Sequence, residues 1–326
     1  MRVSLKPFTP LMLKPLVALV NEAISGRRAA APITPDEFRQ RVLAHPGFDP
    51  AGLLVAADEE GRLLGAVHAI VPPVAIRRYA SLAGRGYIFG PFVRQEARGR
   101  GLGRALLAKA EELLAAECEM AFIHGLRAPF YHAREGPRQP FCGSTEIIGL
   151  NADDVALLDF LRRAGYQARA EPEVSMVAPL RRAEHASPRD VPDDLRLVRI
   201  APQEVWPGPA PRLPEYAEPY EYEGGGEFTH DSLALVQGDR LVGQCVWYPM
   251  RRPGRAALWH LWIDPELRGR GLGRLVLESA LAAITEAGYC EVELHTSPQR
   301  NDVAYALYHS KGFQEITRWI IMEKRL

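Results

Sequence analysis

The sequence predicts an α/β protein built from two copies of one domain, and three observations support this fold class. The chain has 326 residues, which is long enough for two domains of ordinary size. The segment Arg98–Arg104, with the sequence RGRGLGR, recurs letter for letter as Arg268–Arg274. Each copy follows a run rich in β-branched and aromatic residues and precedes a run with an apolar residue at every fourth position. These patterns predict a strand, a glycine-rich turn and a helix, twice in one chain.

The elements around the two turns follow the same order. Tyr87–Val93 and Ala257–Ile263 are typical of strands that end at the turns. A further apolar run follows each helix, at Met120–His124 and at Cys290–His295. The predicted core-facing helix positions are Leu102, Leu106, Ala110 and Leu114 in the first copy and Leu272, Val276, Ala280 and Ile284 in the second. Each copy therefore contains a βαβ crossover with its turn at the carboxyl end of the first strand.

Two predicted hairpins precede these crossovers. In the first copy, Leu53–Ala57 and Leu63–Val71 flank a short polar stretch, and in the second, Ser232–Val236 and Leu241–Tyr248 flank Gly-Asp. The segment Pro207–Gly226 is dense in Pro, Gly, Tyr and Glu and has no periodicity, so we expect a loop there that serves as a substrate lid.

The domain boundaries follow from composition. A stretch rich in Pro, Arg and Asp at 181–194 predicts a linker between an N-terminal domain at 1–180 and a C-terminal domain at 195–326. Near the N-terminus, Leu11–Val20 is apolar but carries Lys14 and Pro15, so we expect an amphipathic helix rather than a signal peptide.

Composition and charge exclude several classes of protein. Forty basic residues balance forty acidic ones, which gives the chain no general attraction for nucleic acid or an anionic membrane. No apolar run approaches the roughly 20 residues that span a bilayer. The four cysteines are widely spaced and form neither a CxxC pair nor a metal-binding spacing with histidine. We therefore expect a cytoplasmic protein with reduced thiols, without metal, nucleic-acid or membrane partners.

The glycine-rich turns are suited to bind phosphate. Free amides at a helix N-terminus and the helix dipole attract anions, and glycine lets the backbone approach the ligand closely. A Walker A loop is absent because neither copy has Gly-Lys-Ser/Thr after four spacer residues. A dinucleotide fingerprint is absent as well, because Arg104 and Arg274 stand where its third glycine is required.

The turns instead resemble the pattern Arg/Gln-x-x-Gly-x-Gly/Ala, the acyl-CoA pyrophosphate motif of the GNAT superfamily of N-acyltransferases. The second copy also resembles the closing segment of that family, Asn-x-x-Ala-x-x-Leu-Tyr-x-x-x-Gly-Phe, between Asn301 and Phe313. The resemblance implies two tandem domains, each with a mixed central sheet flanked by helices, and acetyl-CoA or another acyl-CoA as co-substrate without a metal. The acyl-CoA contacts that it implies are Ile263, Arg268, Gly269, Arg270, Gly271, Leu272, Gly273, Arg274 and Asn301 in the second copy and Val93, Arg98, Arg100, Gly101, Gly103 and Arg104 in the first.

The resemblance also implies a mechanism in which the amine attacks the thioester directly. The strand of the second turn would separate from its neighbour after Trp262–Ile263, and a backbone N–H near Ile263 would polarise the thioester carbonyl. Tyr308 would act as general acid toward the departing thiolate. Glu293 is the candidate general base, with Glu291 and His260 through water as the alternatives.

The first copy lacks these candidate acid and base residues. When the two Gly-aromatic pairs at the ends of the copies are aligned, Leu161 stands opposite Tyr308. When the glycine turns are aligned without a gap, Ala121 and Ile123 stand opposite Glu291 and Glu293. We therefore expect the second copy to be catalytic and the first to bind CoA without turnover or to be architectural.

An N-acetyltransferase acting on the primary amine of a small molecule or peptide is thus the function that the sequence favours. A catalytically inactive CoA-binding sensor or scaffold is the alternative, because both turns would be retained under it. The repeat is compatible with a monomer that forms an internal pseudo-dimer or with a homodimer.

Overall fold

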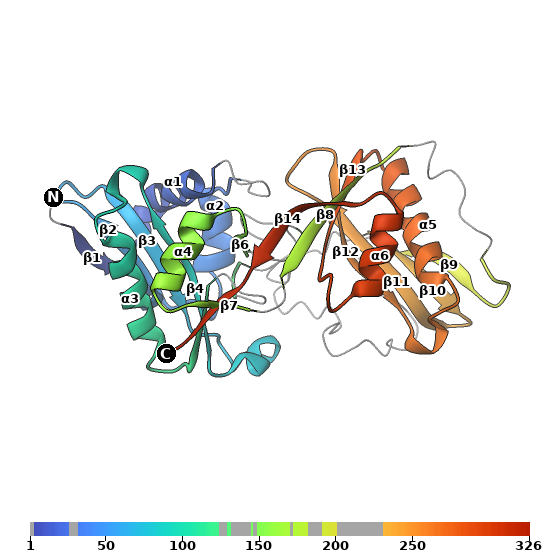
Figure 1. Ribbon diagram of the computed structural model, residues 1–326, viewed down its shortest axis with the longest axis horizontal. Helices are drawn as coiled ribbons and strands as arrows, with labels where there is room; N and C mark the ends of the chain where they lie inside the picture. Colours follow the sequence, from blue (N-terminus) through green and yellow to red (C-terminus); the bar gives the residue numbers. More distant parts are fainter. Residues whose placement is uncertain are drawn as a thin grey trace. The chain divides into compact units, whose positions relative to one another are not determined.

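The structure is a computed structural model that describes residues 3–25, 32–123, 129–131, 145, 149–169, 172–181, 191–200 and 231–326. The chain forms two compact units (Figure 1). Among the described residues, the first unit runs to Glu173 and adds Thr317–Leu326, and the second comprises Val174–Ile316. Mixed sheets flanked by helices confirm the predicted α/β class. The predicted lid Pro207–Gly226, most of the predicted linker and Cys142 lie outside the described residues.

The first unit contains one sheet with helices on both faces. Its elements are β1 (Ser4–Pro7), α1 (Leu13–Ile24), α2 (Pro35–Phe38), β2 (Leu53–Ala57), β3 (Leu63–Ile70), β4 (Arg85–Val93), α3 (Leu102–Leu114), β5 (Met120–Ile123), β6 (Leu150–Asn151), α4 (Val155–Arg163), β7 (Gln167–Ala168) and β15 (Met322–Arg325). The sheet order among the described residues is β1-β2-β3-β4-β5-β15-β7, in which β4 and β5 are parallel. Helix α1 packs on β3 and β4, and α3 packs on β2, β3 and β4.

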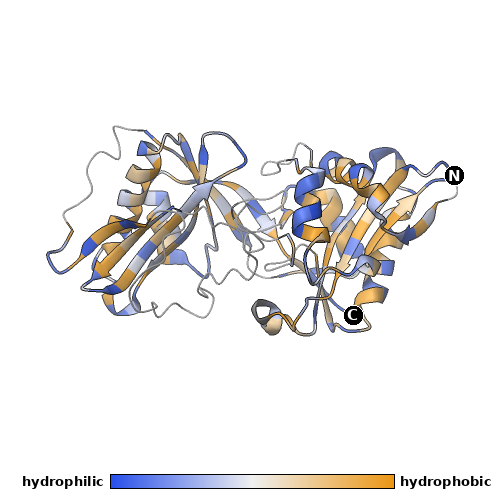
Figure 2. Cartoon of the chain, turned by 180° about the vertical axis from the view of Figure 1, so that it is seen from behind, coloured by the Kyte–Doolittle hydropathy of each residue, from blue (hydrophilic) through white to orange (hydrophobic). Residues whose placement is uncertain are grey.

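Alternation along the strands explains why both faces of this sheet are covered. Leu53 and Val55 belong to the apolar cluster that includes α1 and α2. Leu54 and Ala56 belong to the cluster that includes α3 and α4. Successive side chains of a strand point to opposite faces, so a strand that is apolar throughout needs a layer on each side. Figure 2 shows the result as largely orange strands beneath helices with blue outer sides.

The second unit repeats this arrangement around its own turn. Its elements are β8 (Glu173–Pro179), β9 (Arg196–Ile200), β10 (Asp231–Gln237), β11 (Arg240–Pro249), β12 (Arg255–Ile263), α5 (Leu272–Glu286), β13 (Glu291–Thr296), α6 (Asp302–Ser310) and the start of β14 (Gln314–Ile320), whose residues from Thr317 on belong to the first unit. The strands lie in the order β14-β8-β13-β12-β11-β10-β9, and β12 and β13 are parallel. Helix α5 packs on β10, β11 and β12.

Each unit takes one strand from the other half of the chain. The C-terminal strand β15 pairs with β5 and β7 in the first unit, so the red end of the chain lies among its blue and green elements (Figure 1). Strand β8, which follows the first-unit helix α4 in sequence, pairs with β13 in the second unit. The compact units are therefore not two contiguous stretches of chain, and the predicted linker position at 181–194 stays a prediction.

The predicted hairpins, strands and helices around the two turns are confirmed to within a few residues. Leu11–Val20 is helical from Leu13 on, as its amphipathic pattern predicts. In the part of the chain that the structure describes, no helix is both long and apolar enough to cross a membrane.

Candidate active site

The two glycine-rich turns have the same backbone conformation. Gly269 and Gly271 have φ values of +79° and +78°, and Gly99 and Gly101 have +74° and +82°. These values lie in the left-handed region, which favours glycine over residues with a Cβ. A Cβ built on any of the four meets no atom within 4 Å, so the space in front of each turn is open. The identical sequences therefore fold into two identical open cradles.

Each cradle leads directly into an uncapped helix. Gly271 is the N-cap of α5 and Gly101 that of α3; neither helix start has a side-chain cap or an acidic residue in its first turn. The first amides of a helix have no partner within the helix, and the dipole makes this end partly positive. Both helix starts are therefore suited to hold a phosphate group.

The arginines of the motif have different surroundings. Arg268 Nε donates to the carbonyl oxygen of Ile263 at 3.1 Å, and Arg98 Nε donates to that of Val93 at 3.0 Å. The first arginine of each motif thus closes the turn onto the end of its own strand. The other predicted cationic contacts lie near the cradles as exposed or half-buried side chains, which are Arg100, Arg104, Arg270 and Arg274.

The remaining turn residues hold the helix against the sheet. Leu272 is buried, so only its backbone amide is available to a ligand. A Cβ on Gly273 would lie 3.8 Å from Ile263 and 4.0 Å from Leu307. The corresponding contacts of Gly103 are Val93 and Phe160. Gly273 and Gly103 therefore let α5 and α3 start close to the end of the preceding strand.

Strands β12 and β13 separate beside the second turn. Their parallel pairing ends at Leu258 and Leu294. Beyond this point β12 stays paired with β11 to Ile263, while β13 stays paired with β8 to Thr296. We call the gap beyond Leu258 and Leu294 the fork. A fork is suited to receive an extended ligand, because strand backbone faces it from both sides.

The fork begins earlier than predicted. The expectation that the strands separate after Trp262–Ile263 is wrong, because the last paired residue of β12 is Leu258. A register shift in the β11–β12 pairing, where Trp247 faces Leu258 but Val246 faces His260, explains the difference. Trp259 is the extra residue of this bulge, and a bulge bends its strand away from regular pairing.

Backbone alternation indicates which amides face the fork. The N–H of Asp264 donates to the carbonyl of Val242 on β11 at 2.8 Å. Successive N–H groups of a strand point to opposite edges, so those of Ile263 and Leu261 face the other way, into the fork. The amide of Ile263, a predicted acyl-CoA contact, therefore faces the fork.

Tyr308 lies on the helix side of the second sheet. It is buried in α6 and belongs to the cluster that includes Ile263 and Leu272. Its ring packs against Phe313 with centroids 5.7 Å apart. Asn301 is the N-cap of α6, and its carbonyl accepts from the N–H of Tyr305 at 2.8 Å. The closing motif thus places Asn301 at the start of a helix that carries Tyr308 toward the β12 side of the core.

Glu293 lies on the opposite face of the same sheet. Its neighbours Val292 and Leu294 belong to the cluster beneath α5, so the side chain of Glu293 faces away from that helix. The residue is 1% exposed, and Oε2 accepts from Arg255 Nη1 at 2.7 Å. Burial raises the pKa of Glu293 above its ordinary 4.5, while the hydrogen bond and charge of Arg255 oppose the rise.

Arg255 joins the two predicted carboxylates. Its Nε and Nη2 donate to Glu291 Oε2 at 3.1 and 2.9 Å, in addition to the bond to Glu293. The sequence prediction missed Arg255, because its partners lie more than thirty residues away. The signal that could have found it is the parallel register, which puts the first residue of β12 beside Glu291.

The first unit has neither carboxylate. Its β4–β5 register puts Met120 beside Arg85, as Glu291 is beside Arg255, and puts Phe122 at the position of Glu293. The ungapped alignment with Ala121 and Ile123 is therefore wrong by one residue, because α5 and its C-terminal turn are one residue longer. The conclusion that the first unit lacks both carboxylates is unchanged, because methionine and phenylalanine are no more acidic than alanine and isoleucine. Leu161 in α4 is fully buried.

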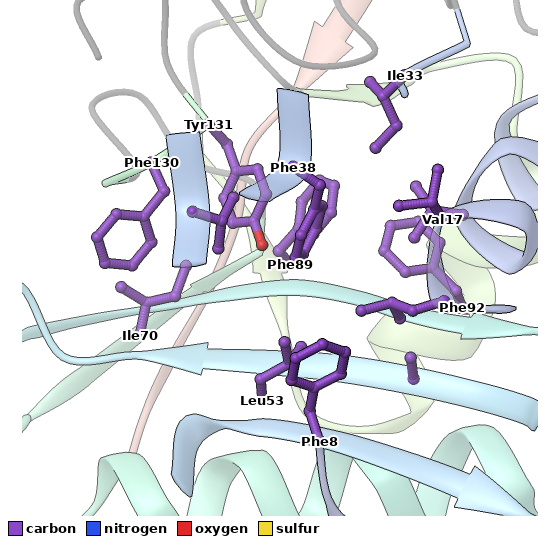
Figure 3. Packing of buried hydrophobic residues seen from close by; sticks show 14 of the residues in the cluster. Phe8, Val17, Ile33, Phe38, Leu53, Ile70, Phe89, Phe92, Phe130 and Tyr131 are labelled. Atoms are coloured by element: carbon purple, nitrogen blue, oxygen red, sulfur yellow. The ribbon is translucent and has the colours of Figure 1, made fainter. Parts of the chain in front are cut away.

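Aromatic residues fill the corresponding face of the first unit. The parallel pairing of β4 and β5 ends at Ile88, and Phe89 follows directly. The Tyr131 ring stacks on Phe89 with centroids 3.8 Å apart. Figure 3 shows the two side chains close together in the apolar cluster. The Tyr131 hydroxyl is hydrogen-bonded to Nδ1 of His68 at 2.9 Å. Burial lowers the pKa of His68 to about 3, so this histidine stays neutral.

Phe130 completes this packing. It has a φ of +71°, which is rare for a bulky residue, and stacks over His68 with centroids 5.6 Å apart. Phe130 and Tyr131 are each 1% exposed. The face that carries Glu293 in the second unit is therefore occupied by side chains of the chain itself in the first.

No group of three or more His, Cys, Asp or Glu side chains among the described residues is arranged to hold a metal ion. The candidate chemistry of the second unit consists of an anion-binding turn, a fork with inward amides, a phenol on one side and a buried carboxylate on the other. These features make the second unit suited to a phosphate-bearing ligand that extends along a strand.

The chain belongs to the acetyltransferase (GNAT) family, whose model matches residues 21–132 and again residues 197–313. The mycothiol acetyltransferase of Beutenbergia cavernae is 26% identical over 295 residues, which cover 86% of this chain and 86% of that protein. The mycothiol acetyltransferase of Geodermatophilus obscurus is 28% identical over 228 residues, which cover 66% and 67%. A tandem GNAT protein from the clavulanic acid biosynthesis pathway has the same fold, with a TM-score of 0.66 at 18% identity over 99% of this chain and 98% of that one.

Proposed function

We propose that the protein transfers an acetyl or other short acyl group from acyl-CoA to a primary amine, and that the second unit performs the transfer. The observation that carries this proposal is the fork beside the second turn, with Tyr308 and Glu293 on its two sides. Both groups are buried, and both are absent from the equivalent positions of the first unit.

The described residues fit acyl-CoA as co-substrate. The open cradle at Gly269 and Gly271 suits the pyrophosphate, since its amides have no side-chain cap. The amides of Ile263 and Leu261 face the fork, where an extended amide-bearing arm can pair with them. An amide beside the thioester carbonyl stabilises the oxyanion, a contribution of about 3–4 kcal/mol.

The chain would supply two proton transfers. An amine arrives as an ammonium and must lose a proton before it attacks. Glu293 is a buried carboxylate on the face of the sheet away from α5, which we call the acceptor side because it would receive the amine. Its raised pKa improves it as a base near neutral pH. The leaving thiolate has an ordinary pKa of about 8.5, so it needs only a modest acid, for which the phenol of Tyr308 suffices.

The first unit would then either bind CoA at its turn or have a purely structural role. Its cradle has the same conformation as the second, which supports binding. Tyr131 and Phe130 fill the face that carries Glu293 in the second unit, which argues against turnover in the first.

The relatives do not identify the acceptor. Their names include a mycothiol acetyltransferase, an L-2,4-diaminobutyric acid acetyltransferase and an N-acetyltransferase of the alanine of a ribosomal protein. These names point to no common acceptor. The direct test is release of free thiol from acetyl-CoA by the full chain, measured against a panel of amines, amino acids, aminoglycosides and peptide N-termini. An enzyme releases thiol with at least one acceptor, whereas an inactive CoA-binding scaffold binds acetyl-CoA and releases none.

Gly271→Val should raise the KM for acetyl-CoA at least about tenfold. The substitution puts a branched side chain at a φ of +78° and into the space where the pyrophosphate is expected. Thiol release by the full chain measures the effect. Gly101→Val is the matched control, because it makes the same change in an identical turn of the first unit. Equal effects of the two substitutions would contradict the assignment of turnover to the second unit.

Arg255→Met should move the acidic limb of kcat/KM to higher pH. The base must be ionised, so the rate falls as the pH drops through the pKa of Glu293. Arg255 holds this pKa down, and its removal therefore raises the pKa further. Glu293→Gln should abolish the limb and lower kcat about a hundredfold.

Two further variants make this pH test specific. Arg255→Lys keeps the positive charge and should restore part of the shift. Arg252→Met removes a more exposed arginine, 3.9 Å from Glu291, and should move the limb less. A limb that stays in place in Arg255→Met, in protein that is folded by circular dichroism, would show that Glu293 is not the base.

A further inference from the structure

Several buried polar atoms in the second unit have no hydrogen-bond partner within the described residues, and two of them belong to residues beside the fork. One is Oε1 of Glu293, whose other oxygen is bound by Arg255. The other is Nε1 of Trp262, a residue that is 3% exposed. A buried polar group without a partner costs about 1–3 kcal/mol. The two atoms are therefore candidates for hydrogen bonds to a bound ligand.

The two residues lie on the same face of the sheet. Glu293 is beside Ala257 in the parallel register, and Ala257 packs with Val246 in the cluster on the face away from α5. Val246 faces His260 across the β11–β12 pair, and Trp262 is two residues further along the same strand. Residues two apart on a strand share a face, so Trp262 and Glu293 are on the acceptor side together.

They also stand at opposite ends of the fork. Glu293 precedes Leu294, the last paired residue of β13, and so lies at the closed end. Trp262 is four residues beyond Leu258, roughly 13 Å along the strand at about 3.3 Å per residue. A molecule that reaches both must span several bonds.

We propose that the acceptor is an amine that carries a neutral oxygen, such as a hydroxyl or carbonyl, at the far end of a chain of several bonds. This inference rests on the proposed function and specifies its substrate class. The carboxylate of Glu293 takes the amine, since an ionised carboxylate only accepts hydrogen bonds. The indole N–H of Trp262 only donates, so its partner is an acceptor oxygen. A plain alkylamine satisfies the first group and leaves the second unpaired.

Trp247 provides a matched control within the same sheet. Its indole Nε1 is equally buried and also lacks a partner among the described residues. Trp247 belongs to the cluster beneath α5, on the face away from Glu293. A substitution to phenylalanine therefore removes the same N–H from the wrong side of the sheet.

The test compares aminoalkanols of three to eight carbons with alkylamines of equal length as acceptors for the full chain. We expect a preference in kcat/KM for the aminoalkanol of about three- to tenfold at the best length, as one hydrogen bond of about 0.5–1.5 kcal/mol allows. Trp262→Phe should bring this ratio close to one, and Trp247→Phe should leave it unchanged. The KM for acetyl-CoA reports whether either variant disturbs the turn.

Each other outcome overturns the inference. These outcomes are a ratio of one at every length in the natural protein, turnover of other amines but of no aminoalkanol, and an equal loss in both variants. A chain that releases no thiol with any acceptor contradicts the proposed function itself, so the two failures are distinguishable.

Discussion

Deletion of residues 321–326 should unfold the first unit, although these residues end the other half of the chain. Strand β15 pairs with β5 from Met322 to Arg325, and the deleted segment contains two buried residues, Ile321 and Met322. Loss of two buried apolar side chains costs about 3–6 kcal/mol, before the lost strand pairing is counted. This approaches the whole stability of an ordinary domain, about 5–15 kcal/mol. Urea unfolding followed by circular dichroism measures the effect.

Polar contacts of Lys324 also hold β15 against the first unit. Lys324 donates to Glu111 on α3 at 2.8 Å, and its ammonium lies 5.5 Å from the centre of the Tyr166 ring. Lys324→Met separates this contact from strand pairing and should cost far less than the deletion. Val303→Asp is the surface control, because Val303 is 80% exposed on α6. A deletion variant with the unfolding midpoint of the natural protein would refute the role of β15.

The pairing of β8 with β13 also predicts which fragments of the second unit are soluble. A fragment of residues 195–316 lacks β8, so β13 loses its neighbour on one side and presents an unpaired edge. A fragment of residues 172–316 includes β8 and should be the more soluble of the two. Equal solubility of both fragments would indicate that β8 does not complete the second sheet.

Tyr308→Phe should lower kcat about ten- to a hundredfold while the KM for acetyl-CoA changes little. The ring packing against Phe313 is retained, so the loss comes from the hydroxyl. General acid–base groups contribute about a hundredfold or more, and a thiolate leaves readily, which puts the expected effect at the lower end. Thiol release at saturating acceptor measures it.

The first-unit counterpart supplies the control for this experiment. Leu161→Ala changes the equivalent position of α4 and should leave kcat nearly intact, although it creates a cavity that lowers stability by about 2–5 kcal/mol. Full turnover in Tyr308→Phe, together with loss of turnover in a folded Gly101→Val variant, would assign catalysis to the first unit.

The sequence by itself determined the local structure of both repeats. The RGRGLGR segment predicts its turn because left-handed glycines and a helix start are local properties of the chain. Apolar spacing predicts α3 and α5, because a helix that covers a sheet needs one apolar stripe. The alignment of Leu161 with Tyr308 needs no tertiary information either, since Asp154 and Asn301 are both N-caps of the helices concerned.

Only the tertiary structure decided the features that depend on strand register and pairing. The fork begins at Leu258 because β12 has a bulge, and no local pattern announces which residue is the extra one. Arg255 meets Glu293 only because two strands far apart in sequence are parallel and in this register. The exchange of β8 and β15 has the same origin. A strand sequence specifies a buried or exposed face but not its neighbour, so the rest of the sheet selects which strand fills each place.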